Sequence, residues 1–128
     1  MPRLQRKSFT TPDQVRQFPT GRVDIVTLDE LAIGRFVFQP GWRWSKDVAP
    51  IVATTTCQHR HVGYTISGSL EVRMNDGTSL VIGAGNAYEI PPGHDAWVVG
   101  DEPWESVEFA SAQCLFLYTP EYYQSARR

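Results

Sequence analysis

Four side chains that can bind a metal ion fall in two short segments of the sequence. Cys57, His59 and His61 stand at alternate positions of the first segment, and His94 follows a Pro-Pro-Gly corner in the second. Residues two apart on an extended strand face the same side of a sheet. If both segments are strands, the donors of each lie on one face of its sheet, and a shared metal site requires these two faces to meet.

A thiolate and two or three imidazoles are the donors that Zn²⁺ prefers, with Fe²⁺ and Ni²⁺ as alternatives, whereas Mg²⁺ and Ca²⁺ prefer oxygen. We therefore predict a divalent metal site formed by His59, His61 and His94, with Cys57 as the fourth ligand or a near neighbour. With three protein ligands and one open position, such a metal would polarise a substrate carbonyl or activate a water molecule.

A pocket without metal is the competing interpretation. His59 then points to solvent, Cys57 is a small buried apolar side chain, and His61 and His94 hydrogen-bond across the pocket. Cys57 as a nucleophile paired with a histidine is a further option, but no oxyanion-hole motif accompanies it. Glu89 as a general base competes with a solvated carboxylate at a strand edge. The sequence has no nucleotide-phosphate motif, Ser-His-Asp order or paired catalytic carboxylates.

Four aromatic side chains are candidates for the walls of a small-molecule site: Trp42, Trp44, Tyr64 and Trp97. Trp42 and Trp44 lie in the irregular stretch 42–53, directly before the predicted metal-binding strand. Two large aromatic side chains argue against disorder in this connection, because they seek burial. For Tyr64 and Trp97, a place in the core or in a dimer interface is the favoured interpretation.

The hydrophobic pattern predicts about ten short β-strands and no amphipathic helix. Runs of β-favouring residues are separated by turn formers such as Asp76-Gly77, a pair typical of tight hairpins. This spacing is typical of a β-sandwich or a β-barrel. The predicted strands cover residues 23–28, 32–39, 51–57, 61–67, 70–74, 80–82, 86–90, 96–99, 105–109 and 114–118.

Length and composition indicate one domain, because a chain of 128 residues buries enough surface to fold alone. Residues 1–20 are expected to form an extended N-terminal arm with one helical turn, capped by Thr11 and started by Pro12. Residues 21–120 are expected to form the barrel, and residues 121–128 a short tail.

Two blocks of the sequence resemble the signatures of the cupin superfamily. Gly85, Pro91 and Gly93 have the spacing of the second cupin signature, and Gly68 matches the end of the first. The resemblance covers about residues 36–110 and implies an all-β fold, the double-stranded β-helix or jelly-roll barrel of cupins. Residues 59–64 and 91–103 are also similar to a narrower group of short bacterial single-domain cupins of uncharacterised activity.

The metal-binding residues of the family do not carry over unchanged. Counting back from the end of the first signature, the family's glutamate falls on His61, its second histidine on Cys57 and its first on Thr55. The histidine of the second signature falls on Ala96, while His94 stands two residues earlier. Shifts by an even number of residues keep the donors on the same face of an extended strand.

The function predicted from these features is that of a small-molecule-binding cupin with a His/Cys metal centre inside the barrel. The alternative is a metal-dependent enzyme, an oxygenase, isomerase or cyclase, that acts on a small carbonyl-containing substrate. Loss of the family's glutamate and the displaced histidine favour the first prediction.

Charge and hydropathy give expectations about partners and location. A formal net charge of -2 offers no electrostatic basis for binding nucleic acid or an anionic membrane surface. No apolar run reaches the length of about 18 residues that a membrane span needs. The N-terminus lacks the apolar region of a signal peptide, so we expect a cytoplasmic protein in which Cys57 and Cys114 stay reduced. By fold analogy we expect a homodimer, paired through the apolar strand 115–118.

Overall fold

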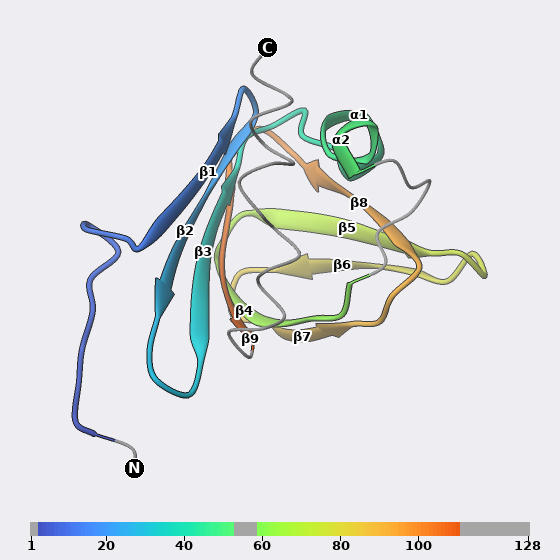
Figure 1. Ribbon diagram of the computed structural model, residues 1–128. Coiled ribbons are helices and arrows are strands. Elements are labelled where there is room, and N and C mark those ends of the chain that lie inside the picture. Colours follow the sequence, from blue (N-terminus) through green and yellow to red (C-terminus); the bar gives the residue numbers. More distant parts are fainter. Residues whose placement is uncertain (1–2, 53–58, 111–128) are drawn as a thin grey trace.

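The structure of the protein is a computed structural model, and it describes residues 3–52 and 59–110. Within these residues the chain forms nine β-strands and two short helices (Figure 1). In chain order they are β1 (Gln14–Phe18), β2 (Gly21–Thr27), β3 (Ala32–Phe38), α1 (Trp44–Asp47), α2 (Ala49–Val52), β4 (His61–Ser67), β5 (Ser69–Met74), β6 (Ser79–Gly83), β7 (Ala87–Ile90), β8 (His94–Val99) and β9 (Trp104–Ala110).

The strands form two antiparallel sheets that face each other across the interior (Figure 1). The larger sheet has six strands in the order β1-β2-β3-β9-β4-β7, and the smaller sheet has three in the order β6-β5-β8. Strand β9 lies between β3 and β4, so residues far apart in the sequence become neighbours in the larger sheet. The all-β fold predicted from the hydrophobic pattern is therefore confirmed.

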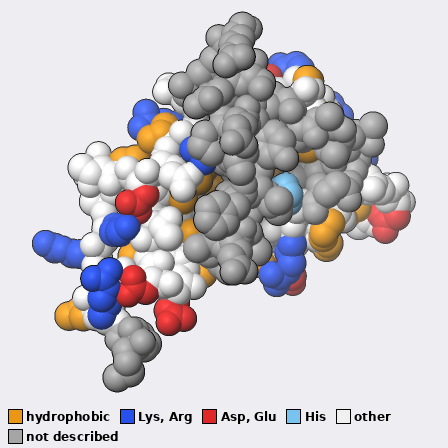
Figure 2. Space-filling view, viewed as in Figure 1, with side chains coloured by type: hydrophobic (Ala, Val, Ile, Leu, Met, Phe, Trp, Pro, Cys, Tyr) orange, Lys and Arg blue, Asp and Glu red, His pale blue; other side chains and the backbone are white. Residues whose placement is uncertain are grey.

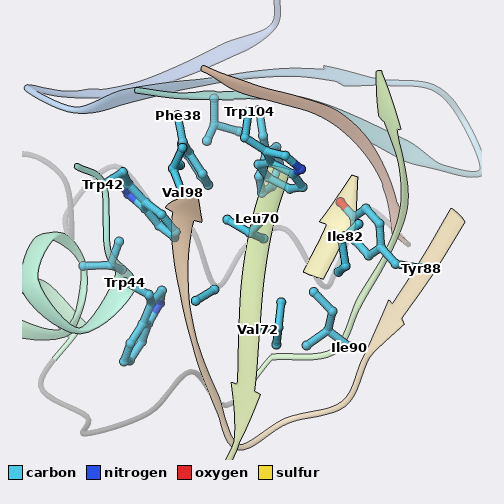
Figure 3. Packing of buried hydrophobic residues seen from close by; sticks show 14 of the residues in the cluster. Phe38, Trp42, Trp44, Leu70, Val72, Ile82, Tyr88, Ile90, Val98 and Trp104 are labelled. Carbon is cyan, nitrogen blue, oxygen red and sulfur yellow. The ribbon is translucent and has the colours of Figure 1, made fainter. Parts of the chain in front are cut away.

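An aromatic-rich core fills the space between the sheets (Figure 3). Inward positions of β3 hold Phe36 and Phe38, and β9 contributes Trp104, which is only 1% exposed. Phe38 stacks on Trp42 with ring centroids 4.1 Å apart and 14° between the ring planes. Full burial of one large apolar side chain stabilises a fold by roughly 1.5–3 kcal/mol. This core therefore holds the two sheets at a fixed separation around the site.

The N-terminal arm takes part in the larger sheet. Residues Gln14–Phe18 form β1, which pairs antiparallel with β2. The helical turn predicted at Thr11 and Pro12 is wrong, since neither residue is helical. One turn of helix fixes several residues for a single hydrogen bond. Strand β1 instead gains a hydrogen-bonded ladder and buries Phe18 against Phe38, with ring centroids 5.9 Å apart.

Two helical turns, α1 and α2, occupy the stretch predicted to be an irregular connection. Helix α2 includes residues 51 and 52, so the strand predicted over 51–57 is wrong at these two positions. Pro50 lies in the first turn of α2, where its missing N–H costs no helical hydrogen bond. Residues 53–57 of that predicted strand, and the strand predicted over 114–118, lie outside the described residues. Neither of these two helices has the length and apolar character that crossing a membrane requires.

Charged side chains of both signs pair on the outer face of the larger sheet. Arg22 Nε lies 2.8 Å from Asp24 Oδ1, and Arg35 Nε lies 2.8 Å from Glu105 Oε2. Figure 2 shows the same mixture of signs among the described residues on the face that it displays. The outer face of the larger sheet also carries exposed apolar side chains, among them Tyr64, Ile66 and Phe109.

Candidate functional site

The space between the two sheets contains a small, mostly apolar cavity. Its volume is about 50 Å³, which is room for a few water molecules or a small ligand group, since one water needs about 10–15 Å³. Titratable side chains on its wall are His61, His94 and Glu108. The other lining residues are apolar or aromatic: Phe18, Val23, Phe36, Phe38, Trp42, Trp44, Val48, Leu70, Ile90, Ala96 and Trp104.

His61 is the first residue of β4, and its side chain lies on the inner face of the larger sheet. The ring is 11% exposed, and its Nδ1 lies 2.7 Å from Glu108 Oε1. An ionised carboxylate only accepts hydrogen bonds, so Nδ1 carries the hydrogen of the neutral ring. The lone pair of the His61 imidazole is then on Nε2.

His94 is the first residue of β8 and is 3% exposed. Its Nδ1 lies 2.8 Å from the carbonyl oxygen of Pro91, which only accepts hydrogen bonds. The turn at Pro91-Pro92-Gly93 places that carbonyl beside the ring, and Gly93 adopts a φ of +90° that favours glycine. The neutral His94 imidazole therefore has its lone pair on Nε2, as His61 does.

The structure brings His61 and His94 together from opposite sheets. Their ring centroids are 5.2 Å apart and the ring planes make an angle of 74°. Two imidazoles on one tetrahedral Zn²⁺, with Zn–N distances of about 2.0–2.1 Å, have centroids roughly 5 Å apart. Metal-bound histidines also characteristically donate their other ring N–H to a carboxylate or a backbone carbonyl. On both criteria these two side chains fit a shared metal ion.

The other two predicted ligands are His59 and Cys57. His59 precedes β4 and is half-buried, and burial lowers the pKa of its imidazole, with a further contribution from the charges of His61 and His94. The His59 ring is therefore harder to protonate than a fully exposed imidazole. Cys57 lies outside the described residues. Within residues 3–52 and 59–110, no three His, Cys, Asp or Glu side chains form a group arranged to hold a metal ion.

Glu108 is a site residue that the sequence did not single out. It is 9% exposed, and both of its carboxylate oxygens are bonded: Oε1 by His61 and Oε2 by the hydroxyl of Tyr88 at 2.7 Å. Burial and the nearby Glu108 charge raise the pKa of Tyr88, so its hydroxyl stays protonated and can donate. A signal was available, because Trp104, Ser106 and Glu108 alternate along β9 and would share its inner face.

Two of the four predicted aromatic wall residues line the cavity. Trp42 and Trp44 are 4% and 7% exposed, and both contribute to its wall. The indole N–H of Trp42 is buried and has no acceptor within the part of the chain that the structure describes. A buried donor of this kind requires an explanation, and a ligand oxygen is one.

Tyr64 and Trp97 do not line the cavity. Tyr64 is 45% exposed on the outer face of β4, because Gly63 and Thr65 take the inward positions. Trp97 lies on the outer face of β8, between Ala96 and Val98, which point inward. The guanidinium of Arg43 lies 4.5 Å from the centroid of the Trp97 ring.

The short segment that carries Trp42 and Trp44 is attached directly to β8. Asp95 on β8 accepts hydrogen bonds from Ser45 N at 3.0 Å and from Arg43 Nε at 3.1 Å. The backbone of Trp42 is joined to the same strand, since Val98 N donates to Trp42 O at 3.0 Å. Helix α1 therefore forms one wall of the cavity as an extension of β8.

Comparisons with known proteins identify the fold. No protein-family model matches the sequence, and no curated protein matches it. Among solved structures, the polyketide cyclase RemF from Streptomyces resistomycificus superposes with a TM-score of 0.60 at 16% identity, covering 94% of this chain and 96% of the cyclase. An RmlC-like cupin from Shewanella frigidimarina gives a TM-score of 0.58 at 19% identity, covering 87% of this chain and 94% of that one.

A third solved structure, the oxalate decarboxylase from Lactobacillus farciminis, gives a TM-score of 0.60 at 21% identity over 82% of this chain. The chain spans only 32% of that decarboxylase and 28% of another from B. subtilis. Together with the two facing sheets, these similarities define the class: the chain has the cupin fold, an all-β jelly-roll barrel. The resemblance of its sequence to cupins is confirmed at the level of the fold.

Proposed function

We propose that this protein is a small-molecule-binding cupin whose interior pocket holds a divalent metal ion between His61 and His94. The observation that carries the proposal is that both rings engage Nδ1 in a hydrogen bond and lie 5.2 Å apart, each with its lone pair on Nε2. His59 and Cys57 are the proposed further ligands. When bound, a divalent cation would polarise a ligand oxygen.

Zn²⁺ is the metal that suits this donor set best, because neutral imidazole and thiolate are its preferred ligands. Fe²⁺ and Ni²⁺ are the alternatives, and a pocket that binds its ligand without metal is the competing form of the proposal. In that form His61, His94 and the indole N–H of Trp42 supply the polar contacts. The apolar wall supports a ligand that is small and mostly apolar, with one or two oxygen atoms.

Elemental analysis tests the metal directly. The protein is expressed in metal-replete medium, purified without chelator and measured for Zn, Fe and Ni per chain. We expect about one metal ion per chain, and a His61→Ala, His94→Ala double variant that retains almost none. Glu89→Gln is the matched control, because Glu89 is exposed on the outer face and pairs with Arg60. A metal content near zero in the wild-type protein would contradict the proposed metal centre and leave the metal-free pocket as the proposed site.

A metal-dependent enzyme is the second proposed function. It is favoured by the His61–Glu108 pair, since a histidine oriented by a carboxylate at the wall of an apolar pocket is an arrangement suited to proton transfer. The near full-length similarity to a polyketide cyclase supports the cyclase member of the predicted set, which also includes an oxygenase and an isomerase. The substrate would be a small, partly apolar carbonyl compound.

Incubating the metal-loaded protein with a panel of small ketones and β-diketones separates the two functions. An enzyme converts at least one compound to a product that mass spectrometry detects, and His61→Ala loses the conversion while Glu89→Gln keeps it. A binding protein binds at least one compound with an affinity that calorimetry measures, and the compound is recovered unchanged. No binding and no conversion across the panel would contradict the proposed carbonyl ligand.

We also propose that the protein is cytoplasmic and forms a homodimer, with no nucleic-acid or membrane partner. The mixed surface charges support the absence of an anionic polymer partner. Light scattering at tens of micromolar protein tests the dimer, and a monomer at that concentration would contradict it.

A further inference from the structure

We propose that Glu108 is a positioning residue that fixes the orientation and the tautomer of His61, and that Tyr88 and Ser106 hold its carboxylate for that task. The inference rests on the proposed function, in which His61 offers Nε2 to a metal ion or ligand.

The register of three neighbouring strands places Gly63 between Glu108 and Tyr88. Gly63 on β4 pairs with Glu108 on β9 on one side and with Tyr88 on β7 on the other. These three residues form one row on the inner face, and neighbouring strands are about 4.8 Å apart. Tyr88 therefore has to cross a whole strand to reach Glu108.

Gly63 is what makes this crossing possible. A Cβ atom at this position would lie 2.7 Å from Tyr88 Oη and 2.4 Å from the backbone oxygen of Val107. Both distances are shorter than real Cβ contacts, so any other residue would occupy the space that the Tyr88 hydroxyl uses. Because Gly63 has no side chain, the Tyr88 phenol can pass over it to reach Glu108.

The Glu108 carboxylate is buried, and both of its oxygens are hydrogen-bonded. A buried carboxylate is costly unless its oxygens are hydrogen-bonded. Here Oε1 faces His61 Nδ1 and Oε2 accepts from Tyr88, each at 2.7 Å. Tyr88 is itself held by Ser106, whose Oγ lies 2.6 Å from Tyr88 Oη and 3.1 Å from the carbonyl oxygen of Tyr64. With both oxygens engaged in protein contacts, Glu108 acts on the site through His61.

The Glu108 carboxylate determines which ring nitrogen of His61 carries the hydrogen. A carboxylate held in this position accepts from Nδ1–H and so keeps the lone pair on Nε2. A glutamine in its place has both a donor and an acceptor. If the amide oxygen accepts from Tyr88, the amide NH₂ faces His61 Nδ1 and favours the opposite tautomer, with the hydrogen on Nε2.

Nitrogen-15 NMR of the metal-free full-length protein at pH 8 measures this directly, because neutral histidine tautomers have distinct ring nitrogen shifts. The chain has three histidines, so His59→Ala and His94→Ala variants assign the signals. We expect wild-type His61 to be almost entirely the Nδ1–H tautomer. In Glu108→Gln we expect a large Nε2–H population, and Zn²⁺ affinity, titrated against a competing chelator, about 10–100-fold weaker.

Two further variants serve as a control and as a second test of the role of Glu108. Glu105→Gln makes the same chemical change on the outer face of β9, where Glu105 pairs with Arg35, and should leave both the tautomer and the Zn²⁺ affinity unchanged. Tyr88→Phe keeps the ring and the carboxylate but removes one hydrogen bond to Glu108. We expect it to weaken Zn²⁺ binding several-fold, and its folding is checked by a proton–nitrogen correlation spectrum.

The outcomes separate this inference from the proposed function. A wild-type protein that binds no Zn²⁺ contradicts the metal centre, while the His61 tautomer still decides the role of Glu108. A protein that binds Zn²⁺ equally well as wild type and as Glu108→Gln, with His61 in one unchanged tautomer, overturns the positioning role and leaves the metal centre standing. If Glu108→Gln does not fold, an unchanged Zn²⁺ affinity in folded Tyr88→Phe contradicts the inference.

Discussion

Replacing Gly63 with alanine tests the internal geometry of the site through the stability of the whole fold. The new methyl group would meet the backbone oxygen of Val107 at 2.4 Å and Tyr88 Oη at 2.7 Å. The Tyr88 hydroxyl can move, but the Val107 carbonyl belongs to β9, which pairs with β4 at this point. Either the pairing of β4 with β9 shifts, or Tyr88 withdraws and leaves Glu108 short of a donor.

Each of these responses has a known approximate cost. Overpacking a well-filled interior costs about 1–3 kcal/mol. Losing a hydrogen bond to a buried charged group costs about 1.5–3 kcal/mol. Reduced freedom of the unfolded chain returns about 0.4–1 kcal/mol when glycine becomes alanine. Since one response is enough to relieve the clash, we expect Gly63→Ala to lower the free energy of unfolding by about 1–2.5 kcal/mol, against the 5–15 kcal/mol typical of a domain.

Urea unfolding followed by tryptophan fluorescence measures the loss, with Gly83→Ala as the matched control. Gly83 also lies in a strand, but a Cβ added there would meet its nearest atoms at 3.8 Å, an ordinary contact. We expect the control to change stability by less than about 1 kcal/mol, within the usual range for unstrained substitutions. A Gly63→Ala protein as stable as Gly83→Ala would refute the claim that Tyr88 passes through the space over Gly63.

Asp95→Ala is expected to destabilise the protein by about 1–2 kcal/mol in the same urea assay, because Asp95 accepts from Ser45 N and Arg43 Nε; an unchanged midpoint would argue against a firm attachment of α1 to β8. The stability of the protein is expected to fall as pH drops from about 6.5, since burial lowers the pKa of His59 in the folded state and the unfolded chain then binds more protons. The fall should be smaller in His59→Ala, and identical pH profiles for the two proteins would contradict this cause. Zn²⁺ affinity is expected to decrease over the same pH range, because only neutral imidazoles bind the metal; a pH-independent affinity between pH 5 and 8 would argue against histidine ligands.

Local sequence signals predicted the strands and the corners that position the histidines. Asp76-Gly77 forms the expected turn between β5 and β6, with Gly77 at a φ of +91° and Thr78 N bonded to Asp76 Oδ1 at 2.8 Å. The Pro91-Pro92-Gly93 corner delivers His94 to the interior at the start of β8. These features depend on residues close together in the chain, which is why a pattern of single residues sufficed.

The alternation of side chains along a strand also predicts which face of the sheet Tyr64 and Trp97 occupy. If His61 and His94 point inward, then Tyr64 and Trp97, each three positions later in the same strand, have to point outward. The structure has both on the outer faces of their strands. Alternation therefore excludes Tyr64 and Trp97 from the wall of a cavity that His61 and His94 line, and their prediction as wall residues is wrong.

Glu108 depends on information of another kind. Its importance comes from β9 lying between β3 and β4, and from a tyrosine that reaches it across Gly63. In sequence, His61 is 47 residues from Glu108, Gly63 is 45 residues away and Tyr88 is 20 residues away. No local pattern reports such neighbours, whereas the order of the strands in the sheet does.

The attachment of α1 to β8 has a consequence for how the cavity responds to its contents. Helix α1 carries Trp44, and strand β8 begins with His94. The two elements are joined by hydrogen bonds from Ser45 N to Asp95 and from Val98 N to Trp42 O. A guest too large for about 50 Å³ would have to displace α1 and β8 together, along with β5, which pairs with β8 from His94 to Val99. Because His94 lies on β8 and His61 on the facing sheet, such a displacement would change the 5.2 Å separation of the two imidazole rings.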